Sequence, residues 1–155
     1  MGRNRYKEAR DKREGRSHVA FPHEVLNSVA FIGLNAHARM LLFDLAAQYK
    51  GNNNGDLCAS WTLMKERGWK SEETLHKAKR QLLERSLIAE TRKGARPNKA
   101  ALYGLTWFAL DECKGKLDML ASSFPRGEYR LLEPLPALKI KTASLATVGV
   151  VEEAG

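Results

Sequence analysis

Four cationic side chains fall within eight residues of one short stretch, RKGARPNK, at positions 92–99. Arginine and lysine at this density can neutralise phosphate groups, with arginine binding them in a bidentate manner. Gly94 and Pro97 interrupt the charges and are typical of a turn. The same composition is also typical of a solvated linker, so the flanking sequence has to decide between a linker and a basic loop. The four cations are Arg92, Lys93, Arg96 and Lys99.

A second set of polar side chains precedes this stretch, at positions 70–84 with the sequence KSEETLHKAKRQLLE. Ser71 is a typical helix N-cap, and Leu75, Ala78 and Leu82 recur at helical spacing. The pattern predicts a helix that extends from the Ser71 cap to about residue 85. One face of this helix is apolar, and charged side chains including Lys77 occupy the opposite face.

The overall charge favours an acidic partner. The 155 residues carry a net charge of +8, with a pI near 9.7. Residues 61–106 hold eleven Lys or Arg against five acids, and residues 1–16 hold seven against three. Nucleic acid is the commonest partner of a small basic domain, and a membrane surface is the alternative. The segment at 1–16 suits either a solubilising tail or a nucleic-acid-binding arm.

Several function classes find no support in the sequence. The sequence contains no run of about 18 apolar residues, which a membrane-spanning helix would require. The N-terminus also lacks the apolar part of a signal peptide. Tyr6 stands where a myristoylation signal requires Ser or Thr. We therefore expect a cytoplasmic protein with neither a membrane partner nor a lipid anchor.

Catalytic and metal-binding patterns are also missing from the sequence. We find no phosphate-binding loop, nucleophile elbow or dinucleotide fingerprint, and the four histidines show no zinc-type spacing with cysteine. Asp44 and Asp56 have no obvious partner and are interpreted as solvated or capping residues. Cys58 and Cys113 are expected to be buried and unbridged. The sequence therefore predicts no enzyme activity, no metal and no cofactor.

The elements that must position the two polar sets follow from periodicity and capping signals. An apolar stripe predicts a helix at 36–50, which Asn35 caps and Gly51 ends, and residues 21–28 form a short helix or an extended lead-in. A turn at 52–56 and a short strand at 57–59 follow. Ser60 caps a helix that continues to about residue 67, and Trp69 is the apolar plug of the next turn. Strands at 87–93 and 99–107 then place the basic stretch at a hairpin tip.

Beyond residue 107, Leu110, Cys113, Leu117 and Leu120 trace an apolar face that predicts a helix at 108–120. This helix is expected to pack on the preceding domain, with partner binding or dimerisation as the alternative. The remaining Pro-containing segment is expected to be a mobile terminus, or else a short docking peptide.

The order of these elements, helix, strand, helix, turn, helix and basic hairpin, resembles the winged helix-turn-helix fold over residues 34–107. The stretch GWKSEETLHKAKRQLLERSLIAETRKG is its most specific part. The preceding stretch FPHEVLNSVAFIGLNAHARMLLFDLAAQYKGNNNGDL resembles helix-turn-helix proteins of proteobacterial phages, plasmids and integrated elements, which are regarded as replication proteins or regulators. It also distantly resembles the origin-binding domains of lambdoid phage replication initiators.

This resemblance implies an α+β, mainly α fold: a winged helix-turn-helix with a C-terminal helical extension and flexible termini. The expected organisation is a basic N-terminal tail at 1–17, the winged helix-turn-helix domain with flanking helices at 18–120, and a Pro-containing C-terminal tail at 121–155. The helix at 71–85 would then be the recognition helix, which lies in the major groove of DNA.

By that geometry, ten residues are candidate DNA contacts. In the recognition helix, Lys70 and Lys77 would neutralise phosphates, Thr74 and Gln81 would reach base edges, and Arg80 would bind either guanine or phosphate. The hydroxyl of Ser71 would either cap the helix or contact DNA. Glu72 and Glu73 favour the helix N-terminus but repel phosphate. The hairpin would add Arg92, Lys93, Arg96 and Lys99 along the backbone or in the minor groove.

The expected function is therefore double-stranded DNA binding in a mobile genetic element, acting in replication initiation through origin recognition. A transcriptional regulator with the same fold is the first alternative, and a protein-interaction module is the second. The few aromatic residues are assigned to the core and strands, which disfavours RNA or single-stranded DNA. Expected partners are duplex DNA, a second copy in a homodimer, and a replicative helicase or its loader.

Overall fold

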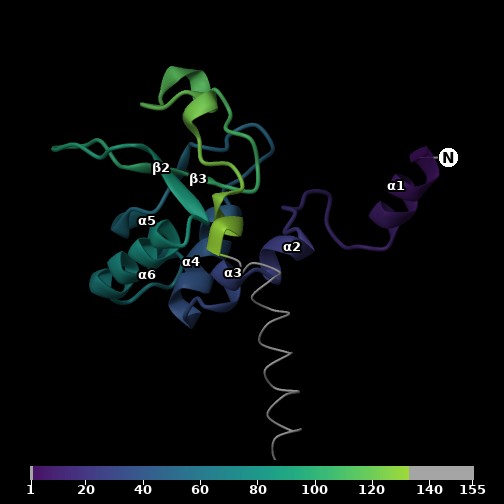
Figure 1. The fold of residues 1–155 in the computed structure, drawn as a ribbon, viewed down its shortest axis with the longest axis horizontal. Helices are drawn as coiled ribbons and strands as arrows, with labels where there is room; N and C mark the ends of the chain where they lie inside the picture. The colour runs from purple at the N-terminus through teal and green to yellow at the C-terminus, as the bar shows by residue number, and fades with distance from the viewer. Residues whose placement is uncertain (1, 133–155) are drawn as a thin grey trace, which may run out of the picture.

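The computed structural model describes residues 2–132, with side chains from residue 5 onward. A small antiparallel sheet is packed against helices, so the fold is α+β and mainly helical, as the sequence predicts (Figure 1). The helices are α1 (Gly2–Asp11), α2 (His23–Leu26), α3 (Val29–Ile32), α4 (Ala36–Ala46), α5 (Trp61–Glu66) and α6 (Glu72–Glu84). The strands are β1 (Leu57–Cys58), β2 (Ile88–Arg92) and β3 (Leu102–Leu105).

The strands β1, β2 and β3 pair in the order β1-β3-β2, so β3 lies in the centre. Both pairings are antiparallel, with Leu57 opposite Tyr103 and Ile88 opposite Leu105. The register shifts between Glu90 and Arg92, where β2 leads into the hairpin. Such a bulge bends and twists a strand, and it changes the direction in which the hairpin leaves the sheet.

The three predicted N-caps of the main helices are present. The side chains of Asn35, Ser60 and Ser71 accept hydrogen bonds from the backbone N–H groups three residues later, at 2.8, 3.4 and 3.3 Å. Each bond satisfies one of the unpaired donors in the first turn of its helix. The helices α4, α5 and α6 therefore begin where the sequence predicts.

Helix α4 ends at Ala46, short of the predicted residue 50. Asn53 explains the difference, because its side chain donates to the carbonyl of Gln48 at 2.8 Å and accepts from the N–H of Lys50 at 2.7 Å. These bonds replace intrahelical ones, so the last residues turn away from the helix axis.

The core lies between α4, α6 and the sheet. Helices α4 and α6 pack against each other, and α6 also contacts β2. The large, fully buried side chains of the core include Leu41, Leu42, Leu45, Leu57, Met64, Leu75, Leu82, Leu87, Ile88 and Leu105. Burial of these apolar groups is the main stabilisation of the fold, at about 25 cal/mol per Å² removed from water.

Residues outside the sheet form hydrogen bonds with backbone groups at both of its outer edges. On β1, the amide of Gln48 donates to the carbonyl of Cys58 at 2.7 Å and accepts from its N–H at 2.8 Å. On β2, the backbone N–H of Asp118 donates to the carbonyl of Thr91 at 2.9 Å, and its carboxylate accepts from the N–H of Lys93 at 3.1 Å. These backbone groups are therefore unavailable for pairing with another strand.

The prediction of a helix at 108–120 is wrong. The segment instead contains the short 3-10 turn η1 (Cys113–Gly115), and Cys113 and Lys114 have positive φ angles that an α-helix does not accommodate. Leu120, expected on the apolar face, is 73% exposed. Fully buried Asn54 holds the start of the segment, because its amide donates to the carbonyls of Leu105 and Ala109, both at 3.0 Å.

The beginning of the predicted C-terminal tail also packs on the core. Phe124, directly after the turn η2 (Ala121–Ser123), and Tyr129, in the turn η3 (Glu128–Leu132), are buried. Turn η3 lies against α3, and Arg130 forms an ion pair with Glu24 of α2. The packed part of the chain therefore continues past residue 120. The rest of the predicted tail, 133–155, lies outside the described residues.

Three smaller sequence predictions can be compared with the structure. The lead-in at 21–28 is helical, since α2 begins directly after Pro22, a residue favoured at helix starts. Part of the basic segment at 1–16 forms α1, which stands apart from the other elements in Figure 1. Cys58 and Cys113 are unbridged as predicted but only half-buried.

Candidate nucleic-acid interface

Helices α5 and α6 form a pair joined by a tight turn. Gly68 ends α5 with a φ of +98°, a conformation that side chains rarely adopt. Trp69 follows and is buried, as the sequence predicts for the plug of this turn. The turn therefore sets the crossing of the two helices through a glycine and a buried indole.

Asp44 of α4 holds this turn from the opposite side. Its carboxylate accepts from the indole N–H of Trp69 at 2.8 Å and from the guanidinium of Arg67, with N–O distances of 3.0 and 3.1 Å. Asp44 is buried, so its interpretation as a solvated or capping residue is wrong. Since charge-assisted hydrogen bonds are among the stronger ones in proteins, Asp44 positions α6 relative to α4.

The start of α6 and the turn before it surround a hollow of about 290 Å³. Lys70 and Ser71 are exposed and Thr74 is half-buried, and all three line this hollow with His37 and Met40 of α4. Ser71 also caps α6. The structure thus brings three of the candidate residues together where the N–H groups of a helix start favour negative charge.

Farther along α6, Lys77 and Arg80 are exposed. Lys77 forms an ion pair with Glu73 at 3.1 Å, one helical turn earlier. Such a pair at the surface is weak, so a phosphate could displace Glu73 as the partner of Lys77.

Gln81 has a structural role that the sequence did not reveal. Its side-chain oxygen accepts a hydrogen bond from the backbone N–H of Asn35 at 2.9 Å. This bond ties α6 to the cap of α4. Substitution of Gln81 would therefore remove a bond that connects α6 to α4.

The hairpin presents three exposed cations, Lys93, Arg96 and Lys99. Its tip is closed by two backbone hydrogen bonds between Ala95 and Lys99, of 2.7 and 2.8 Å. The guanidinium of Arg92 turns inward and donates to the carbonyl of Ala100, with distances of 2.8 and 3.2 Å. Arg92 therefore braces the two arms of the hairpin.

The helix residues and the hairpin residues form two separate groups. Within residues 5–132, no hydrogen bond or ion pair joins a candidate residue of α6 to one of the hairpin. Figure 1 shows the hairpin projecting from the sheet on the same side of the view as α5 and α6. The described surface therefore has a helix with exposed cations and acids and a cationic projection.

Another cation of α6, Lys79, belongs to the interior side of the helix. Its ammonium lies 5.7 Å from the ring centre of Tyr103, and burial lowers the pKa of Lys79. Burial also raises the pKa of Tyr103 to about 12. Lys79 thus packs over the sheet, which separates it from the exposed Lys77 and Arg80.

Sequence reasoning did not identify Asp44, His37 or Met40 as parts of this region. All three lie on α4, at spacings of three and four residues that place them on one side of the helix. This periodicity was the available signal, but it does not show that the side meets the turn before α6. Only the packing of α4 against α6 reveals that.

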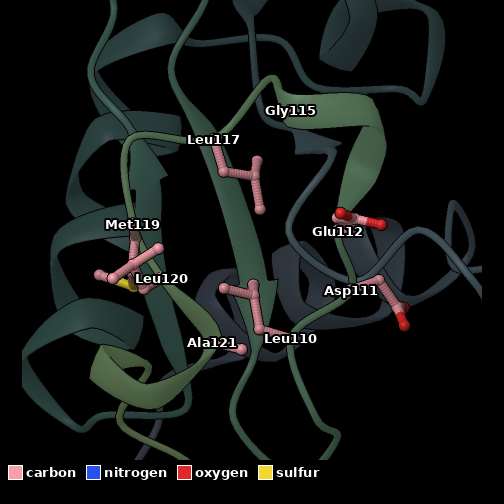
Figure 2. Close-up of a pocket in the computed structure, with 8 residues that line it drawn as sticks. All are labelled: Leu110, Asp111, Glu112, Gly115, Leu117, Met119, Leu120 and Ala121. Atoms are coloured by element: carbon pink, nitrogen blue, oxygen red, sulfur yellow. The ribbon is translucent and has the colours of Figure 1, made fainter.

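A second hollow, of about 320 Å³, lies in the C-terminal segment. Figure 2 shows Leu110 and Leu117 pointing toward each other in this hollow, with Asp111 and Glu112 nearby. Both leucine side chains would clash with a Cβ atom on Gly55, so they cover the turn before β1. Its lining contains two carboxylates, Asp111 and Glu112, and no cationic side chain, so it is not suited to bind phosphate.

Two general findings concern the described residues. No group of three His, Cys, Asp or Glu side chains within residues 5–132 is placed to hold a metal ion. No helix in the described part of the chain is long and apolar enough to cross a membrane.

Comparisons of the chain with protein-family models, curated proteins and solved structures gave no match.

Proposed function

We propose that this chain is a cytoplasmic winged helix-turn-helix protein that binds double-stranded DNA. The observation that carries the proposal is the combination of two exposed cationic features on one scaffold. One is the capped helix α6 with Lys70, Lys77 and Arg80, and the other is the hairpin with Lys93, Arg96 and Lys99. The element order α4–β1–α5–α6–β2–β3 and the sheet order β1-β3-β2 support a winged helix.

The two features would contribute differently to binding. Helix α6 would lie in the major groove, where Thr74 and Arg80 reach base edges and Lys70 and Lys77 bind phosphates. The hairpin would lie along the backbone or in the minor groove and add affinity without reading sequence. Gln81 and Arg92 would contribute mainly by holding α6 and the hairpin in shape, because their side chains bond to Asn35 and Ala100.

The test uses selection from random duplexes, followed by titration of the selected duplex at several salt concentrations. We expect wild-type affinity to fall steeply with salt, with a log-log slope of about −0.9 for each neutralised phosphate. Arg96→Gln with Lys99→Gln should flatten that slope by up to about 1.8 and weaken all duplexes alike. Arg80→Gln should instead reduce the preference for the selected duplex over a scrambled one.

The matched control is Lys114→Gln, which removes an exposed cation of the C-terminal segment and should leave affinity unchanged. Absence of duplex binding by the wild type at low salt would refute DNA binding and favour the protein-interaction alternative. Because the hairpin variant loses two cations and the control one, a control effect of half the size would show that only net charge matters.

Within DNA binding, we propose replication initiation in a mobile genetic element as the task. It is supported by the resemblance of residues 21–57 to initiator-like proteins, and transcriptional regulation is the alternative. An initiator should protect repeated sites at an origin and recruit a helicase or its loader, whereas a regulator should protect sites that overlap a promoter. The symmetry of the selected sites would also show whether the chain binds as a homodimer.

A further inference from the structure

The N-terminal segment at 2–16, here named the basic arm, is not explained by the packed fold. All side chains from residue 5 to residue 18 are exposed. Within the described residues, none of the side chains at 5–17 has a hydrogen bond or ion pair with the rest of the chain. Figure 1 shows α1 well separated from the packed elements.

The composition of the basic arm restricts what it can bind. Its described part has one large apolar side chain, Tyr6, which is 81% exposed. Without an apolar stripe, α1 is poorly suited to an apolar groove or to the interfacial plane of a bilayer. Its charge is the remaining recognition feature, with seven Lys or Arg against three acids in residues 1–16. An isolated ten-residue helix is marginal in water, so neutralisation of these cations by a polyanion would stabilise it.

The arm leaves the packed fold from a fixed point. The ring of Phe21 lies 4.7 Å from that of Phe43 and 5.1 Å from that of Trp107. The indole N–H of Trp107 also donates to the carbonyl of Ala20 at 3.0 Å. Because residues 20 and 21 are anchored, the arm can reach only positions within its own length of this point.

The basic arm is long enough to reach past one helical turn of duplex DNA. Residues 12–19, if extended, would span about 26 Å, and the ten residues of α1 add about 15 Å. The sum exceeds one turn of duplex, about 34 Å. In Figure 1 the arm and the hairpin tip lie on opposite sides of the packed fold. From its anchor at residues 20 and 21, only an arm of this reach would meet DNA beyond the stretch that α6 and the hairpin cover.

We infer that the basic arm binds the phosphate backbone of duplex DNA that flanks the site read by α6, an inference that rests on the proposed function. Its arginines and lysines would form ion pairs with phosphates and read no bases. The arm would therefore increase affinity and residence on DNA without changing the preferred site.

The experiment compares two duplexes that carry the selected site. One covers only the region protected by the protein, and the other has about one further helical turn on each side. The test variant carries Arg5→Gln, Lys7→Gln, Arg10→Gln and Arg13→Gln in the full chain. The matched control carries Arg5→Lys, Arg10→Lys and Arg13→Lys, which keeps the charge.

We expect the wild type and the lysine control to bind the longer duplex more tightly than the shorter one. The glutamine variant should lose this gain, and its salt slope on the longer duplex should flatten by up to about 3.6. On the shorter duplex all three proteins should bind alike. The ratio of affinities for selected and scrambled sites should be the same in all three proteins.

Several outcomes would overturn the inference. Equal binding of the glutamine variant and the wild type to the longer duplex would show that the arm does not contact DNA, while the proposed function would stand. An equal loss on both duplexes would place the arm inside the protected site. Loss of binding to vesicles of phosphatidylserine and phosphatidylcholine, without any effect on DNA, would assign the arm to a membrane surface. Failure of the wild type to bind any duplex would refute the proposed function itself.

Discussion

Two polar side chains, the buried Asp44 and the half-buried Gln81, position the candidate interface. Asp44 receives the indole of Trp69 and the guanidinium of Arg67, and so connects α4 to the turn before α6. Gln81 receives the backbone N–H of Asn35 and connects the middle of α6 to the start of α4. Both residues hold α6 in place relative to α4, and they are therefore positioning residues.

Asp44→Ala should lower the free energy of unfolding by about 2 kcal/mol, because it leaves the buried indole N–H of Trp69 without its acceptor. Urea unfolding would measure the loss. The control is Asp56→Ala, which removes the acid of the more exposed ion pair with Lys116, at 2.9 Å. That change should cost less than about 1 kcal/mol. Similar losses in the two variants would contradict the positioning role of Asp44.

At the scale of elements, the junction between α6 and β2 fixes the direction of the hairpin. Helix α6 ends at Glu84, and Ser86 has a φ of +56° before Leu87 enters the core. The N–H of Leu87 donates to the carbonyl of Leu82 at 3.1 Å, which closes the end of the helix. A left-handed residue is therefore required where the chain turns from helix to strand.

The stability of Ser86 variants should depend on the energetic cost of a left-handed backbone conformation for each new residue. Glycine adopts this conformation without strain, so Ser86→Gly should stabilise the fold by up to about 1 kcal/mol. Ser86→Val should destabilise it by about 1 kcal/mol or more, since branched side chains are outliers there. Thermal and urea unfolding of the two variants would rank them around the wild type. A valine variant as stable as the glycine variant would refute the assignment of this turn.

At the scale of the whole molecule, the chain after β3 completes the fold. Asn54 fixes the start of this segment, Asp118 covers the edge of β2, and Phe124 and Tyr129 are buried. Turn η3 then meets α3, and Arg130 pairs with Glu24 of α2. The end of the described chain therefore connects the sheet to the helices that precede α4.

Tyr129→Ala should lower the free energy of unfolding by about 3 to 5 kcal/mol, because it empties the space of a buried aromatic side chain. Leu131→Ala on the same turn provides the control, since Leu131 is 80% exposed and should contribute little. Denaturant unfolding of the full chain measures both. Equal and small effects would show that residues 121–132 do not support the core.

The sequence determined those parts of the fold that depend on neighbouring residues. The caps at Asn35, Ser60 and Ser71 and the stop at Gly68 are local signals, so α4, α5 and α6 begin as predicted. The candidate residues Lys70, Lys77, Arg80, Lys93, Arg96 and Lys99 are exposed as their positions in helix and hairpin predict. Their contact with DNA remains a prediction for the binding experiments.

The backbone conformation of residues 108–132 depends on tertiary contacts that the local sequence does not show. An apolar periodicity at 108–120 predicted a helix, but Asn54, 51 to 55 residues away from its partners, holds the start of this segment by hydrogen bonds, and Cys113 and Lys114 have positive φ angles. The partners of Asp44, Gln81 and Arg92 were equally hidden, because each bond depends on which surfaces meet in space. Local signals set where helices and turns begin, since their interactions span a few residues. Long-range packing decides which polar side chains hold the fold and which face outward to bind.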